Sequence, residues 1–151
     1  MTFNEYLKLM PIEIHNTIQD IHSELSDMGF IEEIKEAKSG PVLSYAKDKK
    51  VLLNYVYRES SIKVRLYATN ISKYEKRLIK LPDKMKAELK KANDCKKLNG
   101  LNCTPTCQGG YTYTLDGEVL KKCKSMAFLM NMNFESLEYV YDLIIHEAKE
   151  R

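Results

Sequence analysis

The stretch from Cys95 to Cys123 constrains the fold most, because it holds all four cysteines of the chain around one predicted turn. Asp116-Gly117 lies between two runs of strand-forming residues, Tyr111–Leu115 and Glu118–Lys122. An Asp-Gly pair between such runs is a strong signal for a two-residue β-hairpin. The sequence therefore predicts a hairpin inside a cysteine-containing region, which we place at residues 95–124.

The expected register of this hairpin brings cysteines together at its open end. Counting outward from the turn sets Gly110 opposite Cys123, within a few residues of Cys107. Cys103 lies just before Cys107, and Cys95 follows a predicted helix. Four thiolates held tetrahedrally suit zinc, so these four cysteines are candidate ligands of a structural zinc ion.

The spacing of the cysteines leaves two other uses open. Zinc knuckles normally place two cysteines two residues apart, whereas Cys103 and Cys107 have three residues between them, including Pro105. Cysteine is also a residue that is often simply buried. Lysines flank the cluster and favour thiolates, which raises either metal affinity or sensitivity to oxidation. We favour a structural role over a redox role.

Length and composition indicate one globular domain. The chain has 151 residues, of which 44% are hydrophobic and 30% charged, and its net charge is +3. The N-terminal stretch resembles no secretory signal, and no apolar run is long enough to cross a bilayer. We therefore expect a cytoplasmic protein without a membrane partner, in which reducing conditions disfavour disulfides.

An amphipathic helix is predicted from Pro11 to about Gly29. Its apolar positions follow a helical spacing and comprise Ile14, Ile18, Ile21, Leu25 and Met28. His15 and His22 share one side of this helix. We interpret them as residues at the rim of the core, in preference to metal ligands or a proton-responsive edge.

Three strands, 42–46, 51–58 and 62–68, follow as a meander, because β-branched and aromatic residues are enriched there. The turns between them are predicted at Lys47-Asp48-Lys49 and Glu59-Ser60-Ser61.

Helix and strand signals continue to the C-terminus. Helices are predicted over Tyr74–Leu81 and after Pro82, a strand over Met126–Met132, and a closing helix after Asn133. Phe30–Lys38 is ambiguous between helix and strand. The predicted fold is a single α+β domain over residues 1–151. Its antiparallel sheet, extended by the hairpin and the Met126 strand, packs against N- and C-terminal helices.

The third strand of the meander predicts a two-faced sheet. Its apolar residues alternate with Lys63, Arg65 and Tyr67, so one face is basic and carries an aromatic ring. With Tyr55 of the preceding strand, Arg65 and Tyr67 are candidate ligand-binding residues for a small anionic or aromatic molecule. Tyrosines beside basic residues also stack nucleobases, but no nucleic-acid-binding module accompanies them, so a nucleic-acid partner is disfavoured.

The cysteine region resembles the C-terminal module of an uncharacterised family of small bacterial proteins, over residues 95–151. The shared residues are Cys103-x3-Cys107-x2-Gly110-Tyr111, Asp116-Gly117-Glu118, Lys122-Cys123 and Phe128. This resemblance implies that the cysteines act as a set.

A second resemblance covers Phe3 to Lys97, with its Glu5-Tyr6-Leu7 opening, its N-terminal helix and the sheet that follows. This pattern resembles the YdhG-like family, some of whose members are described as frataxin-like iron chaperones. The acidic cluster that iron binding implies is not evident in this sequence.

The sequence contains no complete catalytic motif, and an enzyme would need an acid or base that we cannot locate, so a binding protein is favoured. We expect an intracellular domain that binds a small ligand and uses its cysteines structurally, with zinc as the one cofactor to consider. The alternatives are a metal-handling or thiol redox-sensing protein and, second, a nucleic-acid-binding module. Oligomeric state is left open.

Overall fold

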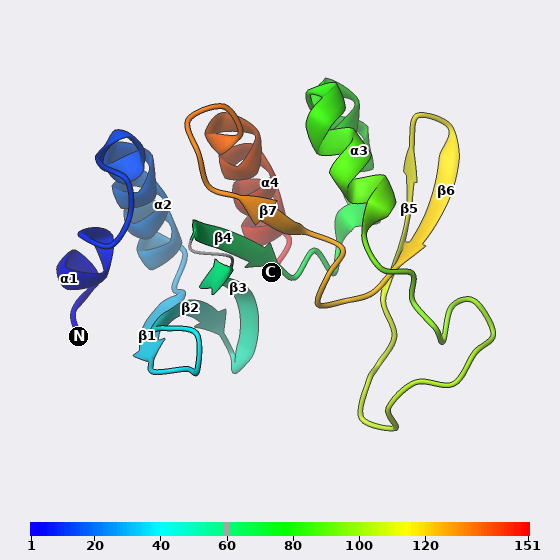
Figure 1. Cartoon of the computed structure of the whole chain (residues 1–151), viewed down its shortest axis with the longest axis horizontal. Coiled ribbons are helices and arrows are strands. Elements are labelled where there is room, and N and C mark those ends of the chain that lie inside the picture. The colour runs from blue at the N-terminus through cyan, green and yellow to red at the C-terminus, as the bar shows by residue number, and fades with distance from the viewer. Residues whose placement is uncertain (59–60) are drawn as a thin grey trace. The chain divides into compact units, whose positions relative to one another are not determined.

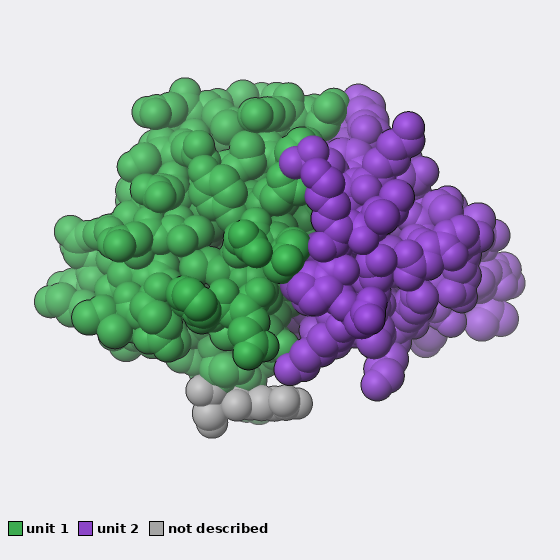
Figure 2. Space-filling model, turned by 90° about the horizontal axis from the view of Figure 1, so that it is seen from above, with its two compact units in different colours: residues 1–66, 130–151 green, residues 67–129 purple. Residues whose placement is uncertain are grey.

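A computed structural model describes residues 1–58 and 61–151, and it confirms the predicted α+β class. The described residues fall into two compact units, residues 1–66 with 130–151 and residues 67–129 (Figure 2). The single domain predicted from the sequence therefore has two compact parts.

The first unit is a sheet covered by helices. Its elements are α1 (Phe3–Leu7), η1 (Ile12–Ile14), α2 (His15–Asp27), β1 (Ile31–Lys35), β2 (Val42–Lys47), β3 (Lys50–Arg58), β4 (Ser61–Leu66), β7 (Leu129–Asn131) and α4 (Leu137–Lys149). Among the described residues the strand order is β1-β2-β3-β4-β7, and neighbours from β1 to β4 pair antiparallel. Helices α2 and α4 lie side by side over one face of this sheet (Figure 1). The antiparallel sheet with N- and C-terminal helices is confirmed.

The covered face of the sheet is apolar, as the alternation in the third predicted strand indicates. In β4, Ile62, Val64 and Leu66 are buried, whereas Lys63 and Arg65 on the opposite face are half-buried. Successive side chains of a strand point to opposite faces, so this alternation separates a core face from an outer face.

The predicted helix to Gly29 is confirmed, with a 3-10 turn before α2. Gly29 has a φ of +91°, which a residue with a Cβ adopts at a cost. The Gly29 N–H donates to the carbonyl of Ser26 and the Phe30 N–H to the carbonyl of Leu25, both at 3.0 Å. These two bonds form a Schellman motif, which ends the helix and turns the chain into β1. The ambiguous segment is therefore a strand.

Some predicted boundaries shift. The strand expected over Met126–Met132 is limited to β7, which nonetheless joins the sheet as predicted. The closing helix begins at Leu137, because the Asn133 side chain accepts from the Ser136 N–H at 3.0 Å in a turn that precedes the helix. The predicted turn Glu59-Ser60-Ser61 begins outside the described residues.

The second unit contains the hairpin. Its elements are η2 (Ile71–Lys73), η3 (Glu75–Lys80), α3 (Asp83–Lys91), β5 (Tyr111–Leu115) and β6 (Glu118–Lys122). The hairpin has the predicted register, with Leu115 opposite Glu118. Asp116 and Gly117 both have positive φ, at 51° and 77°, as expected for a type I′ turn.

The prediction that the hairpin extends the central sheet is wrong. β5 and β6 form a separate two-stranded sheet, and the chain before the hairpin pairs with the β6 edge through Asp94 and Lys122. On that edge the Cys95 N–H donates to the Lys121 carbonyl at 2.9 Å, and the Cys123 N–H donates to the Asn93 carbonyl at 2.7 Å. The hairpin therefore pairs with its own upstream segment.

The buried side chain of Lys122 connects β6 to the C-terminal end of α3. The residue is 5% exposed, although lysine is rarely buried unless it is paired. Its ammonium donates to the carbonyls of Lys90 and Ala92 at 2.8 and 2.9 Å and to Asp94 Oδ1 at 2.9 Å. A cation at this position satisfies carbonyls at the C-terminal end of α3 and complements the helix dipole.

We predict that Lys122→Met lowers the free energy of unfolding by about 2 kcal/mol, because hydrogen bonds to a charged group contribute roughly 1.5–3 kcal/mol. Lys121→Met is the matched control, since it removes the same charge from the exposed neighbouring side chain. Urea unfolding of both variants measures the difference. Equal losses would show that the buried ammonium is dispensable.

Candidate functional site

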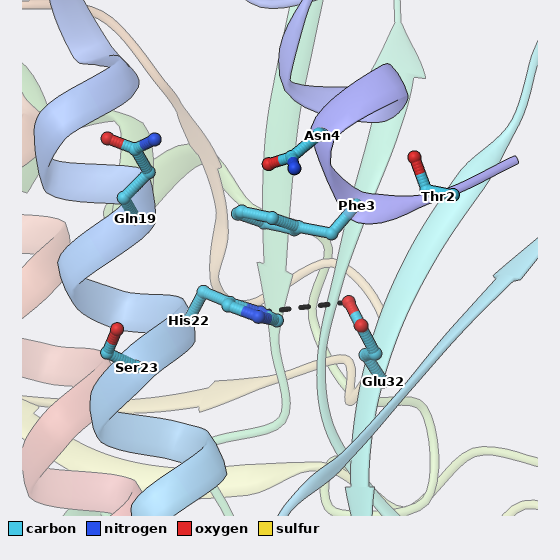
Figure 3. Close-up of a pocket in the computed structure, with 7 residues that line it drawn as sticks. All are labelled: Thr2, Phe3, Asn4, Gln19, His22, Ser23 and Glu32. Atoms are coloured by element: carbon cyan, nitrogen blue, oxygen red, sulfur yellow. Dashed lines mark ion pairs between the residues drawn. The ribbon is translucent and has the colours of Figure 1, made fainter.

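A polar pocket of about 450 Å³ lies at the N-terminal side of the first unit (Figure 3). Its described lining comes from α1 and its N-cap, from α2 and from β1, and consists of Thr2, Phe3, Asn4, Gln19, His22, Ser23 and Glu32. The lining therefore combines one acidic side chain, one aromatic ring and one imidazole with neutral polar groups.

A capping box fixes the position of Phe3. The Glu5 N–H donates to Thr2 Oγ1 at 3.2 Å, and the Thr2 N–H donates to Glu5 Oε2 at 2.8 Å. Further along the same helix, the buried Tyr6 donates its hydroxyl hydrogen to the Tyr55 carbonyl at 3.0 Å. These bonds tie α1 to the sheet, so Phe3 is held against the rest of the pocket.

The ring of Phe3 stacks on the imidazole of His22. Their centroids lie 3.9 Å apart with an interplanar angle of 12°, and Figure 3 shows one ring lying above the other. The two residues come from α1 and α2, so the stack also joins two helices. Both rings keep part of their surface accessible. The pocket therefore offers a preformed aromatic wall.

Two side-chain oxygens lie near the Nδ1 atom of His22. The Tyr45 hydroxyl is 2.8 Å away, with donor and acceptor roles that depend on the imidazole tautomer, and Glu32 Oε2 is 3.7 Å away. Burial raises the pKa of Tyr45 above its ordinary value, so its hydroxyl stays neutral at physiological pH. The buried Tyr45 hydroxyl and the solvent-accessible Glu32 carboxylate therefore lie near the same nitrogen of the imidazole.

Sequence patterns gave a partial view of this pocket. His22 lies at the rim of the core, as predicted. Its ring also contacts Phe3, Tyr45 and Glu32. Phe3 and Glu32 carry no sequence signal of a binding role. The Thr2-x-x-Glu5 spacing marks the start of α1, whereas the stacking of Phe3 on His22 is a tertiary contact that spacing does not encode.

Two of the predicted ligand-binding residues, Tyr55 and Arg65, lie on opposite faces of the sheet. Tyr55 is 0% exposed and pairs with Val64 on the face covered by helices, whereas Arg65 pairs with Asn54 on the opposite face. Tyr67 follows β4 and belongs to the second unit. Tyr55 and Arg65 therefore point away from each other and do not contact one ligand on one sheet face.

The four cysteines have different environments. Cys95 is 5% exposed, and its sulfur accepts from the Gly110 N–H at 3.1 Å. Cys123 is half-buried, with its sulfur 3.5 Å from Ser125 Oγ. Cys103 is exposed and Cys107 is half-buried.

Zinc binding by these cysteines stays a prediction. Among residues 1–58 and 61–151, no group of three or more His, Cys, Asp or Glu side chains is arranged to hold a metal. Cys95 has a buried contact with Gly110, whereas Cys103 is exposed.

No protein-family model, curated protein or solved structure matches the chain. Both resemblances noted from the sequence therefore stay predictions. Within the described part of the chain, no helix is both long enough and apolar enough to cross a membrane.

We predict that Tyr45→Phe destabilises the fold by about 1 kcal/mol, because it removes the hydrogen-bond partner of His22. Tyr55→Phe is the matched control. The Tyr55 hydroxyl is buried and has no hydrogen-bond partner among the described residues, so its removal leaves stability unchanged or raises it. Chemical denaturation of both variants tests this contrast, and a larger loss in Tyr55→Phe would contradict it.

Proposed function

We propose that this protein binds a small planar molecule that carries a cationic or hydrogen-bond-donating group, in the pocket formed by Phe3, His22 and Glu32. The observation that carries the proposal is the stacked Phe3–His22 pair beside a carboxylate. The proposal keeps the small-ligand function expected from the sequence and moves it from the sheet face to the pocket.

The aromatic wall favours a planar ligand. Aromatic rings prefer offset-stacked or edge-to-face contacts, and such a contact adds about 0.5–1.5 kcal/mol to the burial of the ring itself. Because α1 is tied to the sheet through Tyr6 and Tyr55, the wall exists before a ligand arrives. A preorganised wall spares the ligand the entropy cost of ordering side chains.

The charge of the pocket selects between ligands of the same shape. Glu32 supplies the formal negative charge of the described lining, and its side chain is 39% exposed. An anionic ligand would face this carboxylate, whereas an amidinium or amine would donate hydrogen bonds to it. Of the anionic or aromatic ligands expected from the sequence, the pocket therefore favours the aromatic class with a cationic or donating group.

Binding is tested with two probes of one shape and opposite charge, benzamidine and benzoate. We expect benzamidine to shift the backbone amide NMR signals of residues 2–4, 19–23 and 32 at millimolar concentration. Glu32→Gln should weaken its Kd by about tenfold, which corresponds to 1.4 kcal/mol. Benzoate should bind more weakly than benzamidine.

Glu33→Gln is the control, because Glu33 is the exposed neighbour on the same strand and points to the other face. It removes one carboxylate without touching the pocket lining. The proposal fails if benzoate binds as tightly as benzamidine, if both Gln variants weaken binding equally, or if the shifted signals lie elsewhere in the chain.

A further inference from the structure

We propose that the ligand of the pocket is an arginine side chain of an extended peptide, and that this peptide adds to β1 as a further strand of the sheet. The inference rests on the proposed function and names the class of its ligand. The arginine supplies the planar cation, and the peptide backbone supplies additional hydrogen bonds.

β1 is an edge strand of the sheet in the first unit. Its neighbour on one side is β2, and within residues 1–58 and 61–151 no strand pairs with its other side (Figure 1). The register with β2 runs without interruption from Ile31 opposite Ala46 to Lys35 opposite Val42. An edge strand presents N–H and C=O groups outward at alternate residues, and an extended peptide can pair with them.

Glu32 connects this edge to the pocket. It pairs with Tyr45, which is buried on the face of the sheet that the helices cover. Figure 3 shows the Glu32 carboxylate directed toward His22, beside the stacked rings. Residues directly opposite each other in neighbouring antiparallel strands project from the same face, with Cβ atoms about 4.5–5.5 Å apart. The residue of an added strand that lies opposite Glu32 therefore projects toward the pocket.

Arginine matches the chemistry of the pocket. Its guanidinium is planar and always charged, stacks on aromatic rings and donates two parallel hydrogen bonds to a carboxylate. The partly accessible rings of Phe3 and His22 provide the stacking surface, and Glu32 provides the carboxylate. Lysine carries a compact ammonium without a planar face, so the pocket favours arginine over lysine.

The charges along β1 disfavour two other occupants. Residues 31–36 contain three glutamates and one lysine, and this lysine, Lys35, has its ammonium 3.5 Å from Glu33 Oε1. An acidic peptide would be repelled by these carboxylates. A second copy of β1 paired antiparallel about its centre would set two Glu33 side chains opposite each other, and like charges at such positions are destabilising. A cationic peptide is the occupant that the charges favour.

The test titrates the full chain with two probes. One is the peptide acetyl-Thr-Val-Thr-Arg-Val-Thr-amide, and the other is N-acetylarginine methylamide, which carries the same side chain without a strand. We expect both to shift the backbone amide NMR signals of residues 2–4, 19–23 and 32, and only the peptide to slow amide hydrogen exchange in β1. The peptide should bind at least about tenfold more tightly, because it adds backbone hydrogen bonds.

Variants of the peptide separate its two contacts while the protein stays unchanged. Citrulline in place of arginine keeps the planar shape without the charge and should weaken the Kd about tenfold. N-methylation of the arginine or of the following valine removes one backbone donor in each case. Of two neighbouring N–H groups in a strand, one points to β1 and the other to solvent, so only one of these peptides should lose about tenfold or more in affinity.

Two variants of the protein test the arginine contact. Glu32→Gln should weaken binding of the arginine peptide about tenfold and leave binding of the citrulline peptide unchanged. Glu33→Gln is the matched control, because Glu33 lies on the same strand and points to the other face. It should bind the arginine peptide like the parent chain.

The possible failures are distinguishable. Strand addition is overturned if the peptide binds no more tightly than N-acetylarginine methylamide, or if both N-methylated peptides bind like the parent peptide, although binding of benzamidine would still support the pocket. Arginine recognition is overturned if the citrulline peptide binds equally well. A dimer of the protein alone, with β1 already protected from exchange, would assign the edge to a second copy. If benzamidine and both arginine probes leave the pocket signals unchanged, the proposed function itself is wrong.

Discussion

One face of the central sheet carries the apolar side chains that hold the first unit together. Leu53, Tyr55 and Val64 have no exposed surface on that face. Burial of apolar area is the dominant favourable contribution to folding, and it requires that every strand keeps its register, because a shift by one residue turns the apolar set to solvent. The backbone of β3 also receives the Tyr6 hydroxyl, so the position of α1 follows from the same register.

The pocket lies where this core meets water. Tyr45 is buried beneath the pocket, His22 is half-buried, and Glu32 is partly exposed. The exposure of these three interacting side chains therefore increases from the core towards solvent. Buried polar groups are stable only when they are paired, and the Tyr45 hydroxyl is paired with the imidazole. The hydrogen bond that satisfies the core therefore also orients the ring on which Phe3 stacks.

Local signals in the sequence predicted the elements, and competition between elements decided their arrangement. The Asp116-Gly117 turn specified the hairpin and its register, since the required positive φ values belong to those two residues. Local patterns do not specify which sheet a hairpin joins, and here β5 and β6 form a sheet of their own. β3 reads as apolar on both faces, with Leu52 and Val56 buried as well as Leu53 and Tyr55, so alternation alone could not show that Tyr55 faces the core.

The cysteines show how one residue type acquires different surroundings within a single hairpin region. Cys95 and Cys123 lie in segments whose backbones pair at the β6 edge, and pairing there keeps the Cys95 thiol packed against Gly110. Cys103 and Cys107 lie in the connection from that edge strand to β5, outside any strand, where a proline turn sets their spacing. Reactivity of a thiol follows exposure and the stabilisation of its anion. Backbone pairing at the β6 edge therefore accompanies burial of the Cys95 thiol, whereas Cys103 is exposed in the connection outside the strands.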